Sequence, residues 1–164
     1  MISSTVRMLT LLGFMVCCVL LAAAFYLQYG FGYEPCLLCL LQRWIMILLG
    51  VVLLLALLHR PRHWGMRVYG LLVLLIGTLG ASVAARQVWL QMQPPSDSGL
   101  CMPSSWSYLI NNFPLMQAFK MLVAGSQECG QVQWMFWGLS MAGWSMVFFV
   151  LFAALGLFVA RMQR

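Results

Sequence analysis

The chain has 164 residues, of which 63% are hydrophobic and only 7% are charged. A soluble domain of this size would expose far more charge, so the composition excludes an ordinary soluble protein and indicates a chain embedded in a lipid bilayer. The formal net charge of +6 gives little support to nucleic-acid binding, because membrane topology accounts for the excess of basic residues.

Four segments are long and apolar enough to cross a membrane, which takes about 20 predominantly apolar residues. The predicted spans are residues 8–29, 40–58, 69–85 and 139–160. The connections between them are residues 30–39, 59–68 and 86–138. We therefore expect an all-α membrane protein in which residues 1–164 form one domain, a bundle of four transmembrane helices with both termini on the same side.

The first span shares some features with a cleavable signal peptide. Arg7 precedes an apolar run, and Ala22, Ala23 and Ala24 resemble a small-residue cleavage site. The apolar residues nevertheless continue through Leu27, to a length that crosses the bilayer. We expect this segment to be retained as the first transmembrane helix.

Charge predicts the orientation of the four spans. One side of the membrane would have six basic residues and no acid, namely Arg7, Arg60, Arg62, Arg67, Arg161 and Arg164. The other side would have three basic and three acidic residues, namely Arg43, Arg86, Lys120, Glu34, Asp97 and Glu128. Because Lys and Arg near the ends of spans stay in the cytoplasm, we expect cytoplasmic termini and place the loops at 30–39 and 86–138 on the opposite face.

The long loop at 86–138 contains one further helical pattern. From Pro114, apolar residues recur at helical spacing as far as Val123, and Gly125 is a suitable C-terminal stop. A helix of about 10 residues is too short to cross the bilayer. We expect a surface helix lying on the outer leaflet; the alternative is a small helix packed within the loop.

Four of the six cysteines fall in the two loops predicted outside the cytoplasm, and they form two pairs. A disulfide between Cys36 and Cys39 closes four residues and removes only about 2 kcal/mol of chain entropy, against about 3.5 kcal/mol for the 29-residue loop from Cys101 to Cys129. The small ring is therefore a poor brace but a good redox switch. Cys101 follows a segment rich in Pro, Ser and Gly and is the more accessible to a soluble partner, whereas Cys129 is better placed to meet the inner pair. We expect the two pairs to pass electrons by disulfide exchange.

Cys39 lies at the N-terminal end of the second span, where unpaired amide donors and the helix dipole favour a thiolate. Arg43 lies one turn further on the same face and adds a positive charge; the alternative is that its side chain only extends to the lipid headgroups. A zinc site is disfavoured because only one cysteine pair is close in sequence. Covalent haem is excluded because Leu40 rather than His follows Cys39.

The other two cysteines, Cys17 and Cys18, are predicted to lie near the middle of the bilayer. They are about 15 Å along the helix from Arg7 at 1.5 Å per residue, too far from the outer face to meet the other four. We expect them to be small apolar packing residues.

Electrons that reach the inner pair need an acceptor. The sequence has no haem, flavin or iron–sulfur motif and no metal site, and a lipid-soluble quinone is the natural acceptor for a dithiol at the membrane edge. We expect a quinone to bind near Cys39 with a carbonyl group near Arg43 and its ring stacked on Trp44 or on neighbouring aromatic residues. The alternative is that Trp44 belongs only to the interfacial belt of aromatic residues.

The motif at 35–39, Pro-Cys-Leu-Leu-Cys, is followed by Arg43 and by a later pair, Cys101 and Cys129, that flanks the predicted surface helix. Together with the four spans, this pattern resembles the bacterial disulfide bond formation protein B (DsbB) family over nearly the whole chain. The resemblance implies a thiol:quinone oxidoreductase of the bacterial inner membrane. Such a protein reoxidises a periplasmic DsbA-like dithiol oxidase and reduces ubiquinone or another membrane quinone.

The resemblance also implies a role for each site residue. Cys101 would be attacked by the reduced periplasmic oxidase, and Cys129 would then pass to Cys36. Cys39 would be released as the thiolate that contacts the quinone, and Arg43 matches the arginine of the family's quinone site.

The sequence departs from the family pattern at three places. Some relatives have a histidine after the third span, whereas residues 86–93 contain none, which leaves a proton route through water or with help from Arg86. Gln42 stands where some relatives have an acid, and Ala142 replaces a common proline. Two alternative functions stay open: a relay to another membrane protein, and a non-catalytic four-span interaction protein with structural disulfides.

Overall fold

The computed structural model describes residues 2–32, 36–59, 63–92 and 135–162. The predicted surface helix, Cys101 and Cys129 lie outside the described residues. All four predicted membrane spans fall within them, and so do both members of the inner cysteine pair.

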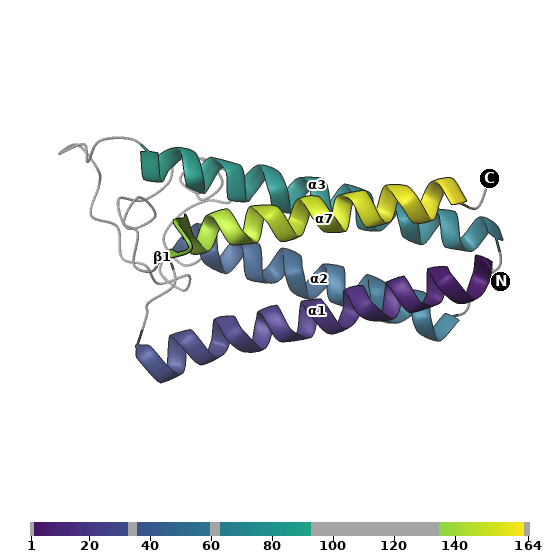
Figure 1. The fold of residues 1–164 in the computed structure, drawn as a ribbon, viewed down its shortest axis with the longest axis horizontal. Helices are drawn as coiled ribbons and strands as arrows, with labels where there is room; N and C mark the ends of the chain where they lie inside the picture. Colours follow the sequence, from purple (N-terminus) through teal and green to yellow (C-terminus); the bar gives the residue numbers. More distant parts are fainter. Residues whose placement is uncertain (1, 33–35, 60–62, 93–134, 163–164) are drawn as a thin grey trace, which may run out of the picture.

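Four long helices form most of the described part of the chain, and they confirm the predicted transmembrane bundle. They are α1 (Ile2–Phe31), α2 (Leu37–His59), α3 (His63–Met92) and α7 (Met141–Met162). Each contains a stretch of at least 22 residues apolar enough to cross a membrane, and at about 1.5 Å per residue such a stretch exceeds the roughly 30 Å hydrocarbon core. The helices run side by side, and both termini lie at one end of the bundle (Figure 1).

A tight β-hairpin precedes the last helix at the other end of the bundle (Figure 1). Its strands are β1 (Met135–Phe136) and β2 (Leu139–Ser140), paired antiparallel with Met135 opposite Ser140. The turn places Trp137 and Gly138 at φ values of 52° and 76°, as a two-residue hairpin turn of type I′ requires. Ser140 then caps α7, because its hydroxyl oxygen accepts a hydrogen bond from the Gly143 amide at 3.2 Å.

The closest helix–helix packing joins α3 and α7 through glycines. A Cβ atom added to Gly156 would lie 2.5 Å from the backbone nitrogen of Leu74, and one added to Gly77 would lie 2.8 Å from that of Ala153. Small residues allow such close approach, which is a main source of helix association in membranes. Beside this contact, Phe149 is fully buried and forms the centre of the core together with Leu49 of α2.

The two mid-bilayer cysteines differ in their surroundings. Cys17 is buried in the core, where its thiol lies 3.6 Å from the Met46 sulfur, which confirms the predicted packing role. Cys18 is exposed on the outward face of α1, so it does not pack in the core. The outward faces of the helices are rich in exposed Leu, Val, Met and Phe side chains, as expected for a surface in contact with lipid.

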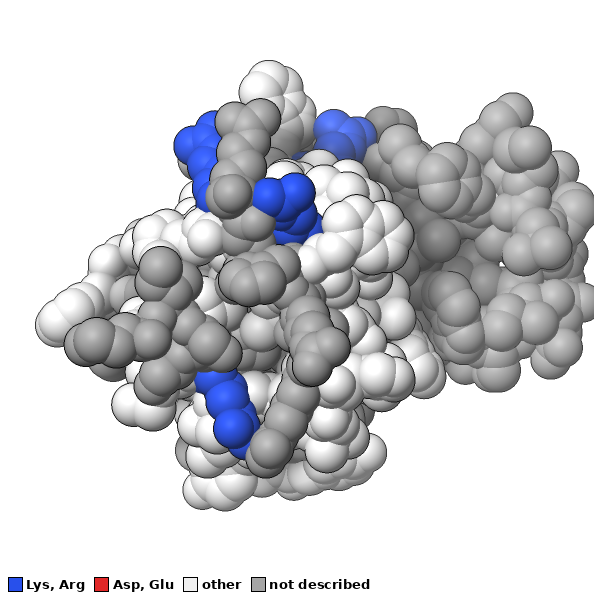
Figure 2. Space-filling view, turned by 90° about the vertical axis from the view of Figure 1, so that its right-hand side faces the viewer, with Lys and Arg blue, Asp and Glu red and all other residues white. Residues whose placement is uncertain are grey.

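The end of the bundle with both termini is basic. Arg7, Arg67 and Arg161 lie near helix ends there, and Figure 2, which views this end, shows several exposed Lys and Arg side chains. The opposite end holds the start of α2 and the hairpin (Figure 1).

The α3 helix also ends there, and it continues to Met92, seven residues beyond the span predicted to end at Ala85. A helix need not end where the hydrocarbon does, and residues 86–92 include the good helix formers Arg, Gln, Leu and Met.

Candidate redox site

Cys36 and Cys39 lie together at the N-terminus of α2. The Cys36 carbonyl accepts the first bond of the helix, from the Leu40 amide at 3.0 Å, and Cys39 follows in the first turn. Their sulfur atoms are 3.0 Å apart, compared with about 2.05 Å in a disulfide, so a small movement is sufficient to form the bond. Cys36 is only 7% exposed, whereas Cys39 is half-buried. The arrangement can therefore cycle between dithiol and disulfide.

Two buried glutamines connect this pair to α3. The Gln87 side-chain nitrogen lies 3.1 Å from the Cys39 sulfur and 3.6 Å from the Cys36 sulfur. The Gln42 side-chain nitrogen in turn donates a hydrogen bond to the Gln87 carbonyl oxygen at 2.7 Å. Sequence reasoning assigned no role to Gln87, because it placed this residue in a loop. The pattern that could have placed Gln87 on the helix is the continuation of helical spacing past Ala85, with Gln87 and Gln91 one turn apart.

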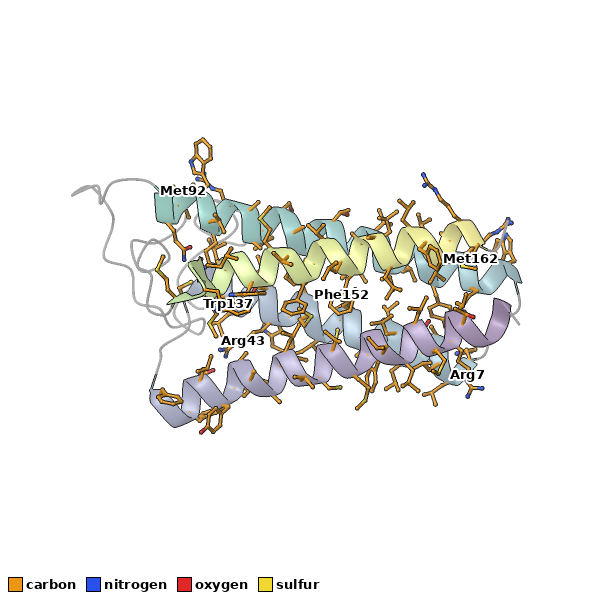
Figure 3. The ribbon with its side chains drawn as sticks, viewed as in Figure 1. Arg7, Arg43, Met92, Trp137, Phe152 and Met162 are labelled. Atoms are coloured by element: carbon orange, nitrogen blue, oxygen red, sulfur yellow. The ribbon has the colours of Figure 1, made fainter. Side chains whose placement is uncertain are left out.

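Arg43 extends from α2 toward α1, near the hairpin end and far from Arg7 (Figure 3). Its guanidinium donates hydrogen bonds to the Gln28 side-chain oxygen and, at 3.1 Å, to the Ala24 carbonyl. It also lies 5.4 Å from the ring centre of Phe25, within range of a cation–π contact. These two hydrogen bonds use only part of the five N–H donors of an arginine, so donors are left for a further oxygen atom.

A cavity of about 350 Å³ opens beside these residues, between α1, α2 and α7. Cys39, Gln42 and Arg43 line one side of it, and its other walls are predominantly apolar. Figure 1 shows α1 diverging from the rest of the bundle toward this end. The volume is within the range of about 300 to 1,000 Å³ that is usual for small-molecule pockets.

Two tryptophans lie differently with respect to this cavity. Trp144 of α7 contributes to its wall together with Phe148. Trp44, predicted to stack on a bound quinone, does not line it and is 63% exposed on the outward face of α2. The reason is helical geometry, because positions 39, 42, 43 and 46 share one face and position 44 does not.

The structure thus brings together Cys36, Cys39 and Arg43 among the predicted site residues. Within the described ranges, no three His, Cys, Asp or Glu side chains lie close enough together to hold a metal ion. A four-span membrane protein with a thiol pair at a helix N-terminus belongs to the class of membrane-bound thiol–disulfide oxidoreductases.

Comparison with known proteins specifies this class further. The sequence profile of the family described as "Disulfide bond formation protein DsbB" matches residues 6–159. A relative named "Disulfide bond formation protein B" from Marinobacter nauticus is 46% identical, and the match covers 90% of this chain and 88% of the relative. A protein of the same name from Azoarcus sp. is 44% identical, with 93% and 91% covered. The chain belongs to the DsbB family, and its role is that of a disulfide-forming oxidoreductase of the membrane.

Proposed function

We propose that this protein is a thiol:quinone oxidoreductase that reoxidises a periplasmic DsbA-like dithiol oxidase. The observation that supports it best is that Cys39 and Arg43 line the same apolar cavity of about 350 Å³. A redox-active sulfur, a fixed cation and an apolar wall are the features that a lipid-soluble quinone requires. The net reaction converts the partner's dithiol to a disulfide and the quinone to a quinol, with transfer of two electrons and two protons.

On the thiol side, the proposed sequence begins at Cys101. A thiolate of the reduced partner attacks Cys101 of a Cys101–Cys129 disulfide, and the partner's second thiol completes its own disulfide. Cys129 then attacks Cys36 of the inner disulfide, forms a Cys36–Cys129 bond and releases Cys39 as a thiolate. The Cys101 thiolate attacks Cys129, which re-forms the outer disulfide and releases Cys36, so that the inner pair is left reduced. The position of Cys39 in the first turn of α2 stabilises that negative charge through the helix dipole.

On the acceptor side, ubiquinone or another membrane quinone supplies a two-electron, two-proton oxidant when it is bound. Arg43 is placed to donate to a carbonyl oxygen in the cavity while its contacts with Gln28 and Ala24 hold the guanidinium against α1. Trp144 and Phe148 provide flat apolar surface for a ring and exclude water. Because Trp44 lies outside the cavity, we assign the ring contact to Trp144 instead.

The proposed location is the bacterial inner membrane with both termini in the cytoplasm. The basic end of the bundle, with Arg7, Arg67 and Arg161, supports this orientation because positive loops stay inside. The inner cysteine pair, at the opposite end, would then face the periplasm, where the dithiol partner resides.

The first test mixes the purified protein with a reduced DsbA-like oxidase and a water-soluble ubiquinone analogue and follows quinone absorbance. We expect loss of the quinone signal with the wild-type protein and none with Cys39→Ser, because serine cannot form a disulfide. Absence of quinone loss with the wild type would favour a relay to another membrane protein or a structural role for the disulfides.

Arg43→Ala tests the acceptor half separately. Hydrogen bonds to charged groups contribute enough that we expect the quinone KM to rise about tenfold or more, while formation of the mixed disulfide at Cys101 stays within about twofold. Arg43→Lys keeps the charge but loses the planar donor fork, so an intermediate KM is expected. If mixed-disulfide formation fails and the quinone KM is unchanged, the role proposed for Arg43 is wrong.

A further inference from the structure

The two glutamines beside the thiol pair are buried, although neither is part of the cysteine motif. Gln42 is 6% exposed and Gln87 is 4% exposed. A buried amide is costly unless its polar atoms have partners, and here the partners are each other and the two sulfurs. The contact joins residues 45 positions apart, on α2 and α3, so the packing of two helices creates it.

The hydrogen bond between the glutamines determines which end of the Gln87 amide meets the sulfurs. A glutamine amide has one end that only accepts and one that only donates. Because the Gln87 oxygen accepts from Gln42 at 2.7 Å, its NH₂ group is directed to the Cys39 and Cys36 sulfurs. The sulfurs therefore face a donor and not a carbonyl oxygen.

We propose that Gln87 is a positioning residue for the inner cysteine pair, which it holds by hydrogen bonds from its side-chain NH₂ group, and that Gln42 sets its orientation. A thiolate is a strong acceptor of such bonds, whereas a disulfide sulfur is a weak one. Gln87 thus stabilises the reduced pair relative to the oxidised pair. When the disulfide takes up two electrons, a proton is bound at Cys36 and the charge stays on Cys39, 3.1 Å from the Gln87 nitrogen.

The consequence for the reaction rests on the proposed function. Stabilising the reduced form makes the Cys36–Cys39 disulfide a stronger oxidant toward the outer pair. Arg43 brings a positive charge from α2 to the cavity that Cys39 also lines, whereas Gln87 acts by a directed hydrogen bond from α3. Gln42 also lines the cavity, so the orientation of Gln87 is set at the wall where an acceptor would bind.

The test measures the reduction potential of the inner pair in the full-length protein, purified in detergent and freed of quinone. Cys101→Ala and Cys129→Ala are introduced so that exchange with the outer pair is removed, and the pair is equilibrated with dithiothreitol buffers at one pH. The reduced fraction at Cys36 and Cys39 is read by alkylation and peptide mass. For Gln87→Leu we expect the equilibrium constant for reduction to fall about tenfold, which is about 30 mV for two electrons.

Three further variants separate the hydrogen bond from general disturbance of the helix. Gln87→Asn keeps an amide on a shorter side chain, so the reduction potential of the inner pair should also fall. Gln42→Leu should cause a smaller fall, because the Gln87 NH₂ group is kept but is no longer oriented by Gln42. Gln91→Leu is the matched control, since Gln91 lies one turn further on α3 and accepts from the Ser140 hydroxyl at 2.6 Å instead of contacting sulfur. The reduction potential of the inner pair in Gln91→Leu should match that of the parent protein with Cys101→Ala and Cys129→Ala.

An unchanged potential in both Gln87 variants, or an equal fall in Gln91→Leu, would overturn the inference. The measurement contains no quinone, so its outcome is independent of the proposed acceptor. If the wild type fails to reduce quinone while the Gln87 variants still shift the potential, the proposed function fails and the inference about Gln87 stands.

Discussion

Trp44 and Trp144 offer a comparison of two identical side chains, one outside the cavity and one in its wall. Trp144 also packs against Phe148, with ring centres 6.4 Å apart. We expect Trp144→Leu to raise the quinone KM several-fold, because it removes part of the flat apolar surface that a ring would contact, which is worth about 1 kcal/mol or more. Trp44→Leu should leave the KM within about twofold, and steady-state kinetics at varied quinone concentration checks both.

The opposite ranking, with Trp44 the more important, would place the quinone on the outward face of α2 and restore the stacking expected from sequence. Expression level and secondary structure content by circular dichroism should be equal in the two variants, so that only the kinetic constants differ. Thiol exchange with the dithiol partner provides an internal control, because the hydrogen bonds that reach the two sulfurs from α3 come from Gln87, which both variants keep.

At the scale of single residues, the parts of the site that are local in sequence could be predicted and the parts that join two helices could not. Cys36, Cys39 and Arg43 are separated by three and four positions, so the geometry of one helix brings them to one side. The contact of Gln87 with Cys39 spans 48 positions and depends on how α2 and α3 pack. Trp44 lies outside the cavity for a related reason, because adjacency to Arg43 in sequence does not place two side chains on the same helix face.

At the scale of elements, the number and positions of the spans follow from apolar length alone, because an unpaired backbone cannot cross a bilayer. The ends of the helices were harder to predict, since α3 extends past the apolar segment to Met92. The hairpin before α7 gave little signal, because strands of two residues are too short for an alternating pattern. Close packing of α3 against α7 depends on glycines whose partners only the structure identifies.

Gly156 allows a specific test of that packing. In Gly156→Ala the new Cβ would lie 2.5 Å from the Leu74 nitrogen and 2.6 Å from the Gly70 carbonyl oxygen, so α3 and α7 must move apart. Overpacking of this kind costs about 1–3 kcal/mol. We expect a lower unfolding midpoint for the detergent-solubilised protein, measured by circular dichroism on heating.

Gly50→Ala is the matched control for this experiment, because Gly50 is also a buried glycine within a transmembrane helix. The nearest heavy atom to its added Cβ would be the Cys17 Cβ at 3.8 Å, an ordinary contact. Replacing a helical glycine by alanine is favourable by about 0.5–1 kcal/mol where space allows. Its midpoint should therefore be unchanged or higher, and a fall as large as that of Gly156→Ala would show that the α3–α7 contact is not the cause.

At the scale of the whole molecule, the two ends of the bundle differ in chemistry. One end has both termini (Figure 1) and exposed basic residues (Figure 2), and the other has the start of α2 with the thiol pair. Charge predicted this polarity from sequence because retention of Lys and Arg in the cytoplasm acts on loops and not on the fold. In the proposed orientation, a dithiol partner outside the cytoplasm and a lipid-soluble acceptor would reach the same helix end from different directions.

Thiol labelling of intact cells tests this orientation directly. After mild reduction, a membrane-impermeant maleimide should modify Cys39, which is half-buried, and a cysteine introduced at Trp137 of the hairpin, which is 85% exposed. A cysteine introduced at Met162, at the opposite end of the bundle (Figure 3), should react only after the membrane is permeabilised. The same reagent and the same cells report on both ends, so each variant controls for the other. If Met162→Cys reacts in intact cells and Trp137→Cys is protected, the orientation is the reverse of the one proposed. The thiol pair would then lie outside the compartment of its proposed partner.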